Sequence, residues 1–113
     1  MYNFIRHFRD YLRLRKAIIM ADERHAQDSD RYYVAPSMDG QLLIMDRKNF
    51  RLMKRKHYIG QNTTLNDLRR MCFYHTPYSN GSDPMPDDVR KEKAELYYQW
   101  AVAKRKEKKH GRR

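Results

Sequence analysis

The first part of the chain repeats its bulky apolar residues at the spacing of an α-helix, and this pattern restricts the possible folds more than any other. From Phe4 to about Ala26 the apolar residues gather on one side of a helical wheel, with basic residues opposite. The apolar side consists of Phe4, Ile5, Phe8, Tyr11, Leu12, Ile18 and Ile19. Because so short a chain buries only about two-thirds of its unfolded surface, we expect this side to lie in the core.

One cation interrupts the apolar side of this helix. Arg15 falls among the apolar positions, where solubility alone would not place it. A carboxylate such as Asp22, further along the same face, is the expected partner, although the guanidinium can also reach water or another molecule. If Arg15 is exposed without a carboxylate, the surrounding apolar patch is a docking surface, which makes Arg15 a candidate partner-binding residue.

Two short apolar segments around a turn predict a β-hairpin. Residues 31–35 and 41–45 are rich in aromatic and branched side chains, and the turn between them contains Asp39 and Gly40. The glycine supplies the positive φ that such a turn requires. Because an isolated hairpin is marginal in water, we expect one of its faces to pack on helices.

Capping residues predict two short helices after the hairpin. Asp46 can cap a helix over residues 47–57, and Thr64 with Asp67 forms a capping box for a second helix. Between residues 75 and 86, prolines and an Asn-Gly pair predict a loop without regular structure. A final long helix is expected to follow this loop.

Together these elements predict one α+β domain over residues 1–103. Long N- and C-terminal helices are expected to pack with a β-hairpin and two short helices, and Trp100 is expected to be buried against Phe8 or Leu12. Residues 104–113 consist mainly of basic side chains, with no apolar residue and a glycine near the end, so we expect a disordered basic tail.

The charge of the chain favours a polyanionic or acidic partner. It has 25 Lys and Arg residues against 14 Asp and Glu residues, a net charge of +11, which favours nucleic acid, an anionic membrane or an acidic protein. The single cysteine cannot form an internal disulfide, which indicates a reducing compartment, here the cytoplasm. No apolar run approaches the roughly 20 residues of a membrane span, and no signal peptide is expected.

Basic residues with aromatic neighbours in the first short helix predict a nucleic-acid interface. Cations neutralise phosphates and aromatic faces stack on unpaired bases, so binding to DNA or RNA without sequence preference is the leading hypothesis. The predicted interface consists of Arg47, Lys48, Arg51, Lys54, Arg55, Lys56 and Tyr58, joined by Lys104, Arg105 and Lys106 of the tail. The alternative is a basic face that only keeps the protein in solution.

Two other binding modes fit the residues less well. A DNA-reading helix-turn-helix around Gly60 would need small or apolar side chains where the chain has Arg55, Gln61 and Arg69. The N-terminal helix has the composition of a membrane-surface helix. Its apolar side, however, is expected to lie in the core of so small a domain, which disfavours membrane docking.

Catalytic and metal-binding patterns are weak. Cys72 and His75 could touch across one helical turn, but a nucleophile also needs an orienting group and an oxyanion site that the sequence does not show. No spacing of Cys and His residues matches a zinc site, and the glycines form no phosphate loop. We therefore expect a non-catalytic protein without cofactor or metal, in which Cys72 is a buried structural thiol.

A resemblance adds a biological setting. The stretch from Met45 to Ile59, with Tyr32–Val34 and Ser37–Gly40 before it, resembles short uncharacterised proteins of gut Bacteroides-group bacteria and their phages or mobile elements. The resemblance implies a bacterial or phage setting and carries over no site residue. It keeps open an alternative function, that of a protein-interaction module or a phage structural or accessory protein.

Overall fold

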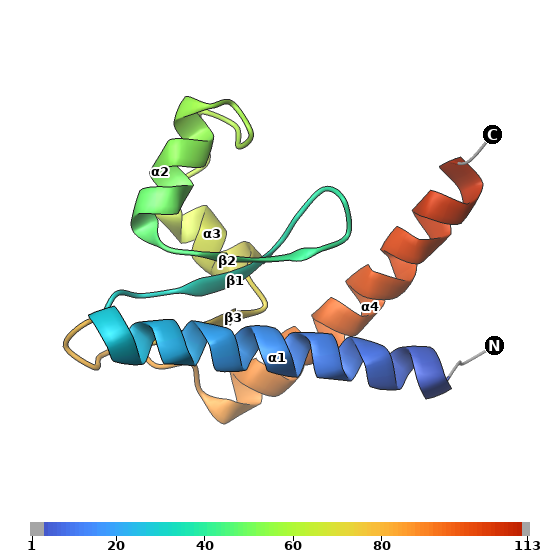
Figure 1. Cartoon of the computed structure of the whole chain (residues 1–113), viewed down its shortest axis with the longest axis horizontal. Coiled ribbons are helices and arrows are strands. Elements are labelled where there is room, and N and C mark those ends of the chain that lie inside the picture. The colour runs from blue at the N-terminus through green and yellow to red at the C-terminus, as the bar shows by residue number, and fades with distance from the viewer. Residues whose placement is uncertain (1–3, 112–113) are drawn as a thin grey trace.

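The computed structural model describes residues 4–111, and their side chains as far as residue 108. The elements in chain order are α1 (Phe4–Asp28), β1 (Tyr33–Pro36), β2 (Leu42–Met45), α2 (Arg47–Arg55), α3 (Leu65–Met71), β3 (Tyr74–His75) and α4 (Asp87–Gly111) (Figure 1). The strands form one antiparallel sheet in the order β2-β1-β3. The predicted α+β class, with two long terminal helices, a hairpin and two short helices, is confirmed.

The sheet lies between two pairs of helices (Figure 1). α1 and α4 cross each other on one side of it, and α2 and α3 lie on the other. The side chains of the central strand β1 alternate between the two sides. Val34 belongs to the core formed with α1 and α4, whereas Tyr33 and Ala35 belong to the core formed with α2 and α3. One strand therefore supplies both cores.

The hairpin has the predicted turn and gains a third strand that the sequence did not predict. Tyr33 lies opposite Met45 in the β1–β2 pair, and Gly40 in the turn has a φ of 86°. The short strand β3 pairs with the other edge of β1, and the backbone N–H of Phe73 just before it donates to the carbonyl of Val34 at 2.8 Å. Three strands with helices on both faces are stable where a lone hairpin is marginal.

Local side-chain caps begin the two short helices as predicted. The Asp46 carboxylate accepts the backbone N–H of Asn49 at 2.8 Å at the start of α2. At the start of α3, the Thr64 hydroxyl accepts the N–H of Asp67 at 3.2 Å, and the Asp67 carboxylate accepts the N–H of Thr64 at 2.8 Å. These bonds satisfy N–H groups that have no partner within the helix.

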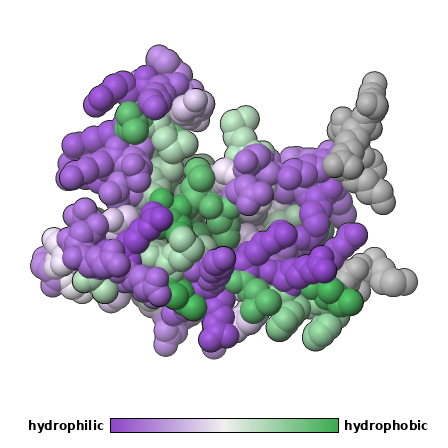
Figure 2. Space-filling model, viewed as in Figure 1, coloured by the Kyte–Doolittle hydropathy of each residue, from purple (hydrophilic) through white to green (hydrophobic). Residues whose placement is uncertain are grey.

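The side of α1 that packs into the core is not the side that the periodicity predicted. Its buried residues are Asp10, Leu14, Ala17, Ile18 and Ala21. The exposed residues Phe4, Ile5, Phe8, Tyr11, Leu12 and Ile19 form what we call the α1 stripe. Phe4 is 71% and Phe8 50% exposed. Figure 2 shows hydrophobic side chains along the lower edge of the molecule, beneath the N-terminal half of α1.

The packing of the core explains why α1 turns its bulky side outward. Small side chains at Ala17 and Ala21 let the helix lie close to the rest of the core. The ring centroids of Phe73 and Tyr97 lie 5.6 Å and 6.0 Å from that of Trp100. This aromatic cluster belongs to the core against which the buried side of α1 packs. Trp100 is half-buried on it, rather than fully buried against the N-terminal helix.

The predicted disordered tail is helical as far as the structure describes it. α4 continues to Gly111, well beyond the predicted domain boundary at residue 103. Lys, Arg and Glu are good helix formers, and Lys104 pairs with Glu107 at 3.1 Å, one turn later. Residues 112 and 113 of the predicted tail lie outside the described residues.

An ion pair joins the two long helices. Nη1 and Nη2 of Arg105 in α4 donate to the two carboxylate oxygens of Asp10 in α1 at 2.8 Å and 2.9 Å. Asp10 is almost fully buried, and the hydrogen bonds to it raise the pKa of Arg105. This bidentate pair fixes the face of α1 that meets α4, and it anchors the last turns of α4.

Candidate nucleic-acid interface

The basic residues predicted at positions 47–56 cover the outer side of α2 and the turn after it. Phe50 is buried on the inner side of α2, in the core formed with the sheet and α3, which turns the cations outward. Arg47, Lys48, Arg51, Arg55 and Lys56 are exposed, and Lys54 is half-buried. Among the described residues, none of these six forms a salt bridge. Figure 2 shows a largely hydrophilic surface over α2.

A pocket of about 540 Å³ that is lined mainly by charged residues lies beside this face. We call it the Arg31 pocket. Its charged residues are Arg31, Arg47, Lys48, Arg51, Arg69, Asp30 and Asp46, and its aromatic residues are Tyr33 and Tyr78. One of the two carboxylates, Asp46, already accepts the N–H of Asn49 as the cap of α2. Cations therefore outnumber carboxylates in the lining, which favours an anionic ligand.

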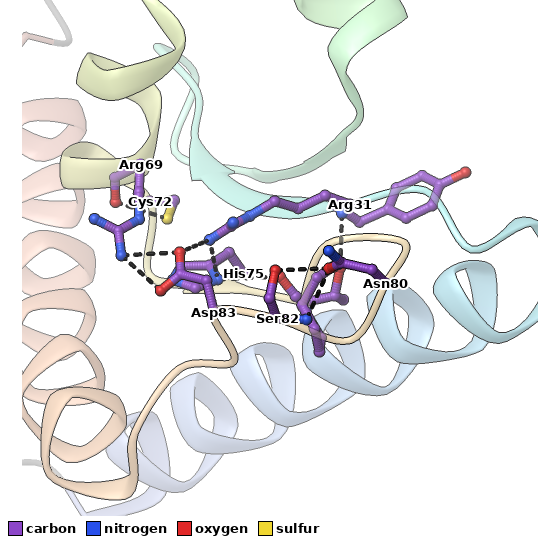
Figure 3. A network of polar contacts seen from close by, with 10 residues as sticks. Arg31, Arg69, Cys72, His75, Asn80, Ser82 and Asp83 are labelled. Carbon is purple, nitrogen blue, oxygen red and sulfur yellow. Dashed lines mark hydrogen bonds and ion pairs between the residues drawn. The ribbon is translucent and has the colours of Figure 1, made fainter.

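Arg31 is the most buried cation of this pocket. Its side chain is 6% exposed, and its guanidinium lies 4.0 Å from the ring centroid of Tyr78. Nη2 donates to Asp83 at 3.0 Å and lies 2.6 Å from Nδ1 of His75 (Figure 3). Nε and Nη1 have no hydrogen-bond partner among the described residues. A buried N–H without an acceptor costs free energy, more so when the group is charged.

Asp83 links the pocket to α3. Its carboxylate accepts hydrogen bonds from Arg31 and, at 3.0 Å and 2.9 Å, from Nη2 of Arg69 (Figure 3). The hydrogen bond from Arg31 lowers the pKa of Asp83. One carboxylate thus serves two guanidinium groups, which leaves excess positive charge at the pocket. Burial lowers the pKa of the neighbouring His75, which favours the neutral imidazole. Nδ1 of His75 lies near both Nη2 of Arg31 and, at 3.1 Å, the carbonyl of Thr76, and it accepts from Arg31 in the tautomer that carries no proton on Nδ1.

Cys72 is a buried thiol, as predicted. It is fully buried at the end of α3, and its Sγ donates to the carbonyl of Arg69 at 3.1 Å (Figure 3). Burial raises the pKa of the Cys72 thiol. The thiolate, which is the nucleophilic form, is therefore disfavoured at neutral pH. Nδ1 of His75 lies 2.6 Å from Nη2 of Arg31.

The structure does not bring the predicted interface residues into one surface. α2 and the C-terminal end of α4 lie at opposite sides of the molecule (Figure 1). Arg105 is held by Asp10 and Lys104 by Glu107, while Lys106 is exposed. Tyr58 is 70% exposed but lines a separate, largely apolar pocket. The cations of α2 are the part of the prediction that coincides with the Arg31 pocket.

Among the residues that the structure describes, Arg15 has no carboxylate partner. It is exposed on α1 within the α1 stripe, and it forms no ion pair or hydrogen bond with a described residue. Asp22, its expected partner, accepts the hydroxyl of Tyr74 at 2.7 Å instead. The predicted salt bridge is wrong, because the face that carries Arg15 points away from the core.

Sequence reasoning missed the residues at the back of the pocket. Arg31 looks like an ordinary flanking cation of the hairpin, and Arg69 like a surface residue of a short helix. Tyr78 and Asp83 belong to the loop that was predicted only as irregular. The proline-rich composition of that loop indicates where the backbone turns. It does not show that the Asp83 carboxylate accepts hydrogen bonds from Arg31 and Arg69.

Comparisons of the chain with protein-family models, curated proteins and solved structures found no match. Within the described residues, no helix is long and apolar enough to span a membrane, and no group of three His, Cys, Asp or Glu side chains could hold a metal ion. The charged face of α2 and the pocket beside it are the features of this chain that point to a ligand.

Proposed function

We propose that the protein binds nucleic acid without sequence preference, through the exposed cations of α2 and the Arg31 pocket. The observation that carries this proposal is a set of cations on one helix face that pair with no described carboxylate and adjoin a pocket with further arginines. Such cations neutralise phosphates and release counterions, which supplies affinity but no base readout. The net charge of +11 adds long-range attraction.

A salt titration tests this function. Fluorescence anisotropy with a labelled single-stranded DNA, the matched duplex and an RNA, each at two salt concentrations, gives the affinity and its salt slope. Each phosphate contact contributes about 0.9 to the slope on duplex DNA and about 0.7 on a single strand. The absence of binding to all three at low salt would refute the proposal.

A matched pair of variants locates the interface. Replacing Arg47 and Arg51 by Gln removes two pocket-lining cations and should reduce the salt slope by about 1.4 to 1.8. Replacing Arg9 and Arg24 by Gln makes the same change of charge on exposed positions of α1. This control should lose much less affinity. Equal losses in both double variants would mean that only net charge matters.

A second candidate function, protein interaction, is favoured by the α1 stripe. Among residues 4–21 the only carboxylate is Asp10, and it is buried against Arg105. Within these residues the exposed charges beside the stripe are therefore positive, including Arg15 in its middle, and the exposed carboxylates Asp22 and Glu23 follow only at its C-terminal end, next to Ile19. An apolar surface with this charge suits a protein that offers an apolar groove rimmed by Asp and Glu. A second copy fits less well, because its stripe carries the same positive charge.

Charge reversal tests this second function. A photo-cross-linker at position 8 identifies the partner, and binding is then measured with the purified partner. Arg15→Glu should weaken that binding, and a Lys in place of the facing partner carboxylate should restore it, whereas Arg24→Glu should have little effect. Concentration-dependent dimers of the protein alone, or binding to anionic vesicles instead of the partner, would count against an acidic protein partner.

A further inference from the structure

The Arg31 pocket combines a buried guanidinium with a stacking ring. Two nitrogens of Arg31, Nε and Nη1, have no hydrogen-bond partner among the described residues, although its side chain is only 6% exposed. Burying a charged donor without an acceptor is unfavourable. Nε and Nη1 are themselves covered, so a ligand oxygen would accept from them after a small movement of the side chains that line the pocket, and an anionic oxygen would form the stronger bond.

The charge around Arg31 selects the ligand. Its carboxylate partner, Asp83, is shared with Arg69, and Arg47 and Arg51 line the same pocket without a described salt bridge. Several guanidinium groups that converge on one space are suited to phosphate, which they bind through paired N–H groups. The pocket volume of about 540 Å³ also falls in the range of small-molecule sites.

Tyr78 adds a surface for a base. One face of its ring lies against the Arg31 guanidinium, with the centroid 4.0 Å from Cζ. The side chain is nevertheless 46% exposed, so the ring has a surface that a planar group can reach. Base stacking on an aromatic ring requires an unpaired base, since a duplex keeps its bases stacked within itself.

We propose that the Arg31 pocket binds one nucleotide of a single strand, with its phosphate on the arginines and its base stacked on Tyr78. This inference rests on the proposed nucleic-acid function and names its ligand. It makes the protein a binder of single strands in preference to duplexes. Tyr78 recognises any base, because every base has a π-face, which agrees with binding that does not depend on sequence.

Exchange of exposed tyrosines tests the stacking step. Tyr78→Leu should lower the affinity for a labelled single-stranded DNA by about 5-fold to 150-fold, the range found for loss of one base–aromatic stack. Tyr78→Phe should keep the wild-type affinity. The matched control is Tyr58→Leu, which removes an exposed tyrosine outside this pocket and should change affinity less than 2-fold. Equal losses for Tyr78→Leu and Tyr58→Leu, or a duplex that binds as tightly as the strand, would overturn the inference.

Small probes separate this inference from the proposed function. Thymidine 5′-monophosphate and inorganic phosphate are titrated into the labelled protein and followed by NMR. The mononucleotide should shift the amides of Tyr78 and of Asn66, which also lines the pocket. Inorganic phosphate should leave the Tyr78 ring signals unchanged. If oligonucleotides fail to bind but the mononucleotide shifts these signals, the assignment of a nucleotide site to the pocket holds and the proposed nucleic-acid binding is wrong. If single-stranded oligonucleotides bind but the pocket variants lose no more affinity than their controls, nucleic-acid binding is supported and the proposed nucleotide site is overturned.

Discussion

Replacing Arg105 by Met tests the ion pair between the two long helices. The side chain of Asp10 is 2% exposed, and Arg105 donates to both of its oxygens at 2.8 Å and 2.9 Å. Removal of the guanidinium leaves a buried carboxylate without its partner, a change that costs about 3 to 5 kcal/mol in other proteins. Because the side chain of Arg105 is 33% exposed, water can reach part of the site. We therefore expect a loss near the lower end, about 3 kcal/mol.

Urea denaturation at neutral pH measures this loss directly. The midpoint should fall while the slope with denaturant stays the same, because the change affects stability and not the surface exposed on unfolding. In thermal denaturation, the loss corresponds to a decrease in Tm of roughly 13 °C. Lys106→Met is the control, because Lys106 is the exposed neighbour of Arg105. It should stay within about 0.5 kcal/mol of the wild type.

The double variant distinguishes a stranded charge from lost packing. Asp10→Leu combined with Arg105→Met leaves no buried charge, so it should recover most of the stability that Arg105→Met loses. A loss below about 1 kcal/mol for Arg105→Met would refute the structural role of the pair. So would a double variant that is less stable than the single variant.

Three further outcomes follow from buried or constrained residues. Burial holds the pKa of His75 below its usual 6.5, so the unfolded chain binds the proton first. Stability present above pH 6.5 should therefore decrease as the pH falls below it, and His75→Gln should flatten the slope of Tm between pH 7.5 and 5.5. The Cys72 thiol, buried with a raised pKa, should react with iodoacetamide at pH 7 only at the rate of unfolding, and a fast reaction in the native state would contradict its burial. Gly40→Ala should cost about 1 kcal/mol in urea denaturation, because Gly40 has a φ of 86°. Gly60→Ala, at a position without positive φ, should cost less.

Features that depend on neighbouring residues could be predicted from the sequence. The caps at Asp46 and Thr64 form bonds to groups three residues away, so a short stretch of sequence contains all the information. The hairpin is local in the same sense, since its turn residues determine the pairing of the flanking strands. The basic face of α2 follows because Phe50 fixes its inner side.

Features that depend on distant residues could not be predicted. The periodicity of α1 shows that one side is bulky and apolar, but it does not show whether another element already fills the core. The side of α1 that packs into the core carries Ala17 and Ala21, together with Asp10, which pairs with Arg105. Asp10 and Arg105 are 95 positions apart in the chain. The pocket is non-local in the same way, because Arg31 meets Asp83 across 52 positions.

The position of β1 couples the two cores of the protein. Its alternate side chains belong to the cores on both sides of the sheet, so neither pair of helices can separate without exposing part of this strand. A ligand that binds only the native state raises the free energy of every opening that disrupts its site. Amide hydrogen exchange should therefore slow in α1 and α4 when single-stranded nucleic acid occupies the Arg31 pocket, although this ligand touches neither helix.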